Sequence, residues 1–296
     1  MTFLERILET KREEVLALQR SHDLQTYTRT GCHPETGQRL TPTRGFQAAV
    51  REGSTLALIA EVKQASPSKG QIATAFDPVQ TAATYERAGA SAVSVLTDVQ
   101  YFKGSIGDLE AVRKTVSLPV LRKDFIIDEL QIAQARLAGA DAVLLICAAL
   151  SSSRLVELSN YAKSIGIDTL VEVHHERELE AALAAEPSVL GINNRDLHTF
   201  EVSLETTQRV LQQVPERVTA IAESGVRTQE DAALMAQYGA QGILVGEALM
   251  RTTHDSELAR LIQTLRVSRA GQSDLASSNS FDESDTDAVF QSETEQ

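Results

Sequence analysis

The residues best suited to chemistry lie in one short segment, Leu58–Gly70, which reads LIAEVKQASPSKG. It begins as an apolar, β-branched run that is typical of a buried strand. Glu61 and Lys63 stand two residues apart, so on a strand their side chains leave the same face. A carboxylate and an amine at a buried strand end are costly unless they take part in chemistry. The pair therefore predicts an acid–base site, and an ion pair at a surface strand end is the plainer alternative.

The loop that follows this pair suits an anion. Its sequence, Ser-Pro-Ser-Lys-Gly over residues 66–70, supplies backbone N–H groups, hydroxyls and a positive charge. This combination favours a ligand such as phosphate. An ordinary turn is the alternative when this loop is considered alone.

The chain that must position these residues has a repeating pattern from residue 56 onward. Short apolar runs alternate with amphipathic stretches. The apolar runs are Leu56–Val62, Ala92–Leu96, Pro119–Leu121, Ala142–Ile146, Thr169–Val173, Val189–Ile192, Val218–Ala222 and Gly242–Val245. The helical candidates span 78–88, 106–116, 128–138, 151–165, 176–185, 203–213, 228–238 and 254–267.

Strands that alternate with helices in this way predict parallel βα units. About 210 residues hold the eight units, which is the size of a closed (β/α)8 TIM barrel in the α/β class. A doubly wound open sheet is the alternative. It is disfavoured because no Gly-x-Gly-x-x-Gly follows the first apolar run.

The two ends of the chain differ from this repeat. Apolar residues near a 3.6-residue period predict an amphipathic helix over residues 3–20, and a turn-rich connection over 21–45 leads to a short helix at Phe46–Val50. We expect residues 1–50 to form a helical extension that covers the barrel mouth. The barrel would take residues 51–269, and 270–296 would be a disordered acidic tail.

Composition limits the partners and the compartment. The net charge of −13 argues against nucleic acid as a partner, and no apolar run reaches the length of a membrane span. No signal peptide is visible, and Cys32 and Cys147 form no disulfide framework, so a cytoplasmic location is the simplest expectation. His174 and His175 are adjacent and would leave a strand end in opposite directions, so we expect no metal site.

Polar residues end six of the eight apolar runs. In a (β/α)8 barrel these ends share one mouth, where the active site lies. A solvated face would scatter such residues, whereas here they converge. They include Glu61, Lys63, Lys123, Glu172, Asn193, Arg195, Glu223 and Glu247. Glycine turns at Gly225 and Gly246 follow the last two runs, where barrels commonly bind phosphate on backbone N–H groups and a short helix.

With these motifs in place, the sequence resembles the indole-3-glycerol phosphate synthase family of tryptophan biosynthesis, from about Leu4 to Met250. The resemblance rests on the segments Ile59–Gly70, Ser94–Asp98, Phe102–Ser105, Leu121–Phe125, Leu170–His174, Gly191–Leu197 and Ala222–Val226. It implies a carboxy-lyase that closes 1-(2-carboxyphenylamino)-1-deoxy-D-ribulose 5-phosphate to an indole, with loss of CO2 and water. It implies no cofactor.

The resemblance also implies roles for single residues. Lys123 matches the general acid of ring closure, and Glu172 matches an acid or base of dehydration, with Glu61 and Lys63 nearby. Asn193 would hydrogen-bond the intermediate. The binding residues would be Arg195 for neighbouring carboxylates, Glu223 and Ser224 for sugar hydroxyls, Ser66, Lys63, Gly225, Gly246 and Glu247 for phosphate, and Phe102, Phe125 and Leu144 for the aromatic ring. Ordinary core packing is the alternative for Phe102 and Leu144.

The chain departs from the family pattern in three places. Gln64 stands where many relatives carry Arg, which alters the charge of the loop. Glu247 stands where a small residue is also found, so only its backbone N–H would bind phosphate. The chain has no Trp, so other residues of the N-terminal segment must cover the substrate.

Two other functions stay open from the sequence. Another phosphate-binding barrel, such as a sugar-phosphate isomerase or aldolase, would share Gly225 and Gly246 but would not need both lysines and both glutamates. A noncatalytic sugar-phosphate-binding barrel would tolerate loss of Lys123 or Glu172. As partners we expect the phosphorylated small-molecule substrate, a monomer or weak homo-oligomer, and possible contacts with other enzymes of the pathway.

Removal of the tail should leave the enzyme unchanged. Residues 270–296 hold seven acidic residues, six serines and no cation, and cannot bury enough apolar surface to offset the roughly 1–2 kcal/mol of backbone entropy per ordered residue. We expect truncation after Arg269 to preserve both activity and melting temperature. A clear loss of either quantity would show instead that the tail, around Phe290 for example, docks on the body of the protein or on a partner.

Overall fold

The computed structural model describes most of the chain between residues 2 and 269. The described residues are 2–21, 24, 26–27, 30, 32, 35–37, 40, 42–66, 70–71, 76–197, 199–252 and 254–269. The tail at 270–296 and much of the connection predicted over 21–45 lie outside them. Within this part of the chain, no helix combines the length and the apolar character needed to cross a bilayer.

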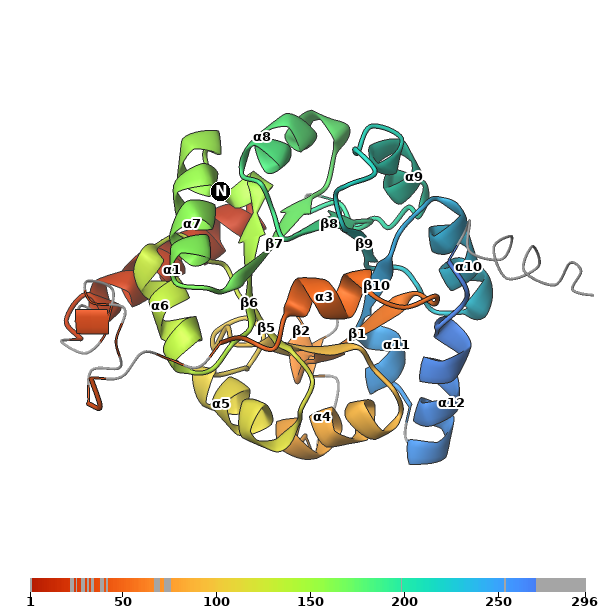
Figure 1. Ribbon diagram of the computed structural model, residues 1–296, viewed down its shortest axis with the longest axis horizontal. Coiled ribbons are helices and arrows are strands. Elements are labelled where there is room, and N and C mark those ends of the chain that lie inside the picture. The colour runs from red at the N-terminus through yellow and green to blue at the C-terminus, as the bar shows by residue number, and fades with distance from the viewer. Residues whose placement is uncertain are drawn as a thin grey trace, which may run out of the picture.

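Eight parallel strands close into a barrel, as the sequence predicts (Figure 1). Around the barrel their order is β1-β10-β9-β8-β7-β6-β5-β4, so neighbours in the chain are neighbours in space and β10 closes onto β1. The strands are β1 Ala57–Val62, β4 Ala92–Leu96, β5 Val120–Lys123, β6 Ala142–Ile146, β7 Asp168–Val173, β8 Val189–Asn193, β9 Ala220–Glu223 and β10 Gly242–Val245. Closure excludes the doubly wound open sheet.

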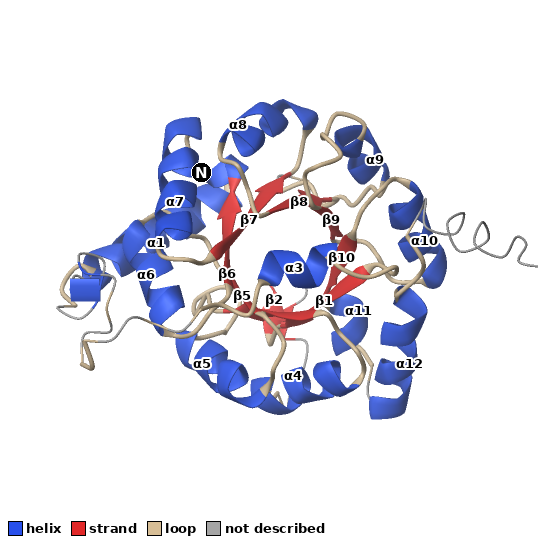
Figure 2. Cartoon of the chain, viewed as in Figure 1, coloured by secondary structure: helices blue, strands red, loops and turns tan. Residues whose placement is uncertain are grey.

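Helices form a ring around the strands (Figure 2). They are α4 Pro78–Arg87, α5 Ile106–Thr115, α6 Glu129–Leu137, α7 Ser152–Ser164, α8 Leu179–Ala184, α9 Glu205–Leu211, α10 Gln229–Gln237, α11 Glu247–Met250 and α12 Asp255–Leu265. Ser151 and Thr228 accept hydrogen bonds from the first turns of α7 and α10, which fixes where these helices begin. Gly139 follows α6 with a φ of 91°, a conformation that ends a helix at little cost for glycine.

The strands alternate between two apolar layers. Along β1, Ala57 and Ile59 pack inside the barrel, whereas Leu58 and Ala60 pack against the outer helices. Glu61 continues the inward series of odd-numbered residues. The strand period therefore carries its carboxylate into the barrel interior, as the sequence predicts.

The amino-terminal end of the barrel is closed by α3, Phe46–Arg51, which lies across the centre of Figure 1. Phe46 and Val50 are fully buried against the residues that fill the barrel. The backbone N–H of Gln47 donates to Asp168 Oδ2 at 3.0 Å, at the start of β7. Arg269 donates to the carbonyl oxygen of Val50, so the last described residue also holds this helix.

The helix α1 (Phe3–Leu18) lies toward the opposite end, where Phe3, Leu4 and Ile7 line the cavity described below, and it packs against α6. A capping box between Thr2 and Glu5 begins it. Among the described residues of 1–50, α1 therefore contributes to the mouth, whereas α3 fills the amino-terminal end. The loop after β1 also forms a hairpin of β2 (Ala65–Ser66) and β3 (Gly70–Gln71), too short for a sequence period to indicate.

Candidate active site

A cavity of about 200 Å³ lies at the carboxyl ends of the strands. Every predicted site residue lines it except Ser66, whose side chain lies outside the described part of the structure. The polar lining includes Glu61, Lys63, Lys123, Glu172, Asn193, Arg195, Glu223, Ser224, Gly225, Gly246 and Glu247. The convergence predicted from the strand ends is therefore what the barrel produces.

Lys123, at the end of β5, is the centre of this polar lining. Its Nζ lies 3.3 Å from Glu223 Oε2, 3.7 Å from Glu172 Oε2 and 3.8 Å from Glu61 Oε2. Burial opposes the charge of this ammonium, but the three carboxylates outweigh it and raise the pKa of Lys123. The amine therefore remains protonated at neutral pH.

Glu61 has a second cation beside it. Lys63 Nζ donates to Glu61 Oε1 at 2.5 Å, so the pair seen in the sequence is an ion pair inside the barrel mouth. Burial opposes ionisation of Glu61, but Lys63 and then Lys123 outweigh it and lower the pKa of the carboxyl group. Glu61 thus stays ionised at neutral pH.

Glu223 behaves in the opposite way. Burial, with the neighbouring Glu172, outweighs the attraction of Lys123 and raises the pKa of Glu223 to about 8. Oε2 of Glu172 is buried without a hydrogen-bond donor among the described residues. Glu223 therefore holds its proton near neutral pH, and the oxygen of Glu172 can meet a donor on a substrate.

Two glycines make room for the carboxylates. A Cβ on Gly191, in β8, would collide with Oε1 of Glu223, and one on Gly246, after β10, would collide with Oε1 of Glu61. The polar cluster thus depends on the absence of side chains on neighbouring strands.

The apolar wall comes from the barrel and from α1. Phe102 and Phe125 lie 6.2 Å apart at a tilt of 37°, and Leu144 is almost fully buried beside the cavity. The sequence did not identify Phe3, which lines the same cavity and packs edge-on against Phe200 at 6.1 Å. The helical period of α1 showed an apolar face, but not the surface that this face covers.

The far end of the cavity has backbone suited to an anion. Ser224 and Gly225 have φ values of 63° and 91°, and successive unusual backbone conformations of this kind can turn N–H groups toward a ligand. Asn194, to which the sequence gave no role, donates from Nδ2 to the carbonyl oxygen of Ser224 at 3.1 Å. The Glu247 side chain, which also borders this end of the cavity, pairs with Arg251 one turn along α11.

The two adjacent histidines have separate partners. His174 Nε2 lies 3.3 Å from Glu172 Oε1, whereas His175 Nε2 lies 3.6 Å from Asp196 Oδ2. Among the described residues, no group of three or more His, Cys, Asp or Glu side chains is arranged to hold a metal ion.

Fold and cavity together define a (β/α)8-barrel enzyme with a buried lysine–carboxylate cluster at the carboxyl ends of its strands. Residues 4–262 match the family model for indole-3-glycerol phosphate synthase. The chain is 48% identical over 268 residues to the indole-3-glycerol phosphate synthase of Oceanobacillus iheyensis, covering 90% of this chain and 97% of that one. It is 47% identical to that of Chlorobium phaeobacteroides, covering 89% and 99%. The chain belongs to the indole-3-glycerol phosphate synthase family.

A solved structure supports the fold independently. Thiamine phosphate pyrophosphorylase from Pyrococcus furiosus is similar with a TM-score of 0.53 at 15% identity, covering 71% of this chain and 95% of that chain. At this identity the likeness extends to the barrel alone.

Gly191→Ala should impair turnover while the barrel still forms. The new methyl group would meet Glu223 Oε1 and displace that carboxylate from Lys123. We expect kcat/KM to fall by roughly 10²-fold, the order of loss that a 1 Å misplacement causes. Gly107→Ala in α5 is the matched control, because its Cβ would have only an ordinary contact with Ser105. Equal kinetics for the two variants would show that Glu223 tolerates displacement.

Proposed function

We propose that this chain catalyses the indole-3-glycerol phosphate synthase reaction, with Lys123 as the general acid of ring closure. The observation that supports this most directly is the position of one ammonium among three carboxylates, beside an aromatic wall. The substrate, 1-(2-carboxyphenylamino)-1-deoxy-D-ribulose 5-phosphate, has an aromatic ring, a carboxylate, hydroxyls and a phosphate. Each of these groups has a suitable partner in the cavity.

In this proposal the substrate lies across the mouth. Its ring packs against Phe102, Phe125 and Leu144. Its phosphate binds backbone N–H groups of the Ser224–Gly225 and Gly246–Glu247 turns, with Lys63 and Ser66 contributing from the first loop. The family acts on a phosphorylated small molecule, and the positive φ angles at the first turn favour an anion there.

Ring closure joins the ring carbon that bears the carboxylate to the ketone carbon. The ketone oxygen takes a proton from Lys123, and CO2 then leaves so that the ring becomes aromatic again. A lysine ammonium also suits the substrate carboxylate before it departs. Asn193, at the end of β8, hydrogen-bonds the intermediate, and Arg195 holds neighbouring carboxylates in place by its charge.

Dehydration removes the new hydroxyl group together with a proton from the adjacent carbon. Glu172 acts as the acid or base of this step, with the Glu61–Lys63 pair beside it. Oε1 of Glu172 lies 3.3 Å from His174 Nε2, and this contact limits rotation of the Glu172 carboxylate. Glu223 and Ser224 bind the sugar hydroxyls.

The other barrel functions account for less of the site. A sugar-phosphate isomerase or aldolase would use the glycine turns, but would leave the clustered lysines and glutamates and the aromatic wall unexplained. We place the reaction in the cytoplasm, consistent with two free cysteines. The enzyme would act as a monomer or weak homo-oligomer, and the tail at 270–296 would not be needed for turnover.

Lys123→Ala should nearly abolish activity. Addition of the substrate to the wild-type protein should produce indole fluorescence, which no Trp in the chain obscures. Loss of a general acid typically costs roughly 10²–10⁴-fold in rate. Lys163→Ala is the control, because that lysine is 62% exposed and pairs with Glu186. A folded Lys123→Ala variant that keeps more than half of the wild-type rate would remove Lys123 from the mechanism.

Glu172→Gln should stall the reaction after closure begins. Glutamine preserves the shape of the side chain but cannot transfer a proton, so we expect kcat to fall by about 10²-fold or more. The measurement is the pH–rate profile, with rapid quenching to detect an accumulated intermediate. An unchanged rate and profile would give Glu172 a structural role only.

A further inference from the structure

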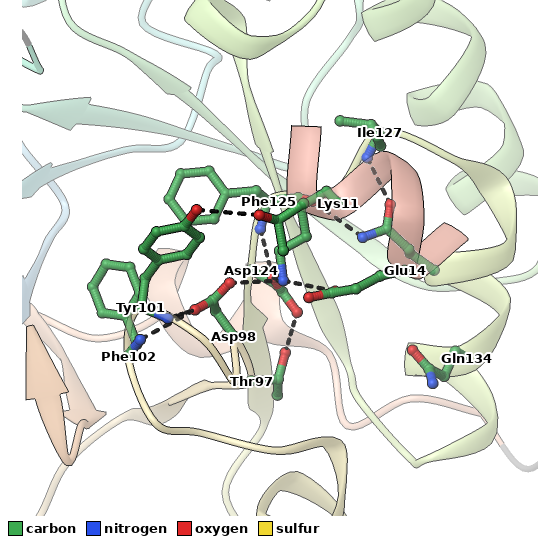
Figure 3. Close-up of polar contacts among 12 residues, drawn as sticks. Lys11, Glu14, Thr97, Asp98, Tyr101, Phe102, Asp124, Phe125, Ile127 and Gln134 are labelled. Atoms are coloured by element: carbon green, nitrogen blue, oxygen red, sulfur yellow. Dashed lines mark hydrogen bonds and ion pairs between the residues drawn. The ribbon is translucent and has the colours of Figure 1, made fainter. Parts of the chain in front are cut away.

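A second buried charge cluster lies beside the cavity, centred on Lys11 of α1 (Figure 3). The lysine is 1% exposed. Its Nζ lies 2.8 Å from Asp98 Oδ2 and 2.9 Å from Asp124 Oδ1, and Glu14, one turn further along α1, completes the set at 2.9 Å. The proposed chemistry uses none of these side chains. A fully buried lysine on an outer helix is unusual, because burial of its charge is costly unless carboxylates lie at hydrogen-bonding distance, as they do here.

Asp98 connects Lys11 to the loop after β4. Its Oδ1 accepts the backbone N–H groups of Tyr101 at 2.6 Å and Phe102 at 3.1 Å. The Tyr101 hydroxyl in turn lies 3.1 Å from Thr10 Oγ1 of α1. The aromatic wall residue Phe102 is therefore placed by a carboxylate whose other oxygen pairs with Lys11.

Asp124 connects Lys11 to the end of β5, directly after Lys123. Its Oδ1 accepts the backbone N–H of Phe125 at 2.8 Å, and its Oδ2 accepts from Arg122 at 3.0 Å and from Thr97 at 2.6 Å. The backbone on both sides of Lys123 is thereby held. A shift of Asp124 would move the proposed general acid and the aromatic wall together.

The cluster is a fixed anchor rather than a pH switch. Burial opposes the charge of Lys11, but Asp124 and Asp98 outweigh it and raise the pKa of the lysine. Burial likewise opposes ionisation of Asp124, but Arg122 and Lys11 outweigh it and lower the pKa to about 2. Both groups therefore stay charged across the neutral range.

The residues of α1 that line the cavity lie on the same face of the helix as Lys11. Phe3, Ile7 and Lys11 are spaced four residues apart, so they lie on one face of α1. Phe3 and Ile7 line the cavity, whereas Lys11 is inserted between the loops. The position of Lys11 thus determines where the apolar face of α1 lies.

We propose that Lys11 is a positioning residue of the synthase reaction: its ammonium joins α1 to the ends of β4 and β5, so that Phe3, Phe102 and Lys123 are held around the substrate as one unit. The proposal rests on the function proposed above. It assigns to the N-terminal helix a part in catalysis that depends on one buried ion-pair cluster.

The test is Lys11→Met in the full-length protein. We expect kcat/KM to fall by about 10- to 100-fold, with KM raised because the apolar wall is displaced and kcat lowered because Lys123 is less well held. Lys163→Met, an exposed lysine on α7, is the matched control and should stay within twofold of wild type. Kinetics are measured well below the melting temperature of each variant, with folding checked by circular dichroism.

A double-mutant cycle separates positioning from mere stability. Phe3→Ala should raise KM in the wild-type background and have less than a twofold effect in Lys11→Met, because α1 is then already displaced. If the Lys11→Met protein does not fold, the double variant Lys11→Met/Asp98→Asn takes its place in the cycle. This variant removes one positive and one negative charge, so it leaves one fewer unpaired carboxylate in the cluster.

Two results would overturn the proposal. One is a lower melting temperature with kcat and KM within twofold of wild type. The other is an equal effect of Phe3→Ala in both backgrounds. Absence of product with the wild-type protein would instead contradict the proposed function, so the two failures are distinguishable.

Discussion

The site depends on one buried lysine shared by carboxylates from three strands. Glu61, Glu172 and Glu223 are far apart in the chain, and only barrel closure brings them within 3.3 to 3.8 Å of Lys123. Buried carboxylates without a cation would be strongly unfavourable. One lysine cannot compensate all three, which is why Glu61 stays ionised beside its second cation, Lys63, while Glu223 has a raised pKa. A site with both a proton donor and carboxylates in different states follows from that imbalance.

The end of β5 serves two purposes because side chains alternate along a strand. Lys123 points into the cavity, whereas its neighbours Arg122 and Asp124 pair with each other, and Asp124 also pairs with Lys11. The first of these two clusters has charges free to meet a substrate. The second has nearly every charge matched at hydrogen-bonding distance, which suits it to hold backbone in place. Lys123, which faces the cavity, and Asp124, which pairs with Lys11, are thus consecutive residues at the end of β5.

The two ends of the barrel also differ in the side chains that fill them. Phe46 and Val50 fill the amino-terminal end with apolar side chains, and their burial there contributes stability. At the other end, Gly191 and Gly246 withhold side chains and leave space that the carboxylates and a substrate can occupy. This division is the one expected of (β/α)8-barrel enzymes, in which the carboxyl ends of the strands carry the chemistry.

The sequence by itself determined the barrel and most of the polar site. The runs Ala92–Leu96, Ala142–Ile146 and Gly242–Val245 match β4, β6 and β10 to the residue, because apolar periods and helix caps are local signals. The strand period also placed Glu61 and Lys63 on one face. Only the tertiary structure decided which surface α1 covers. An amphipathic pattern shows that a helix packs without showing its partner, and Lys11 is indistinguishable in sequence from a solvated lysine. Its carboxylate partners come from strand ends that barrel closure alone brings to it.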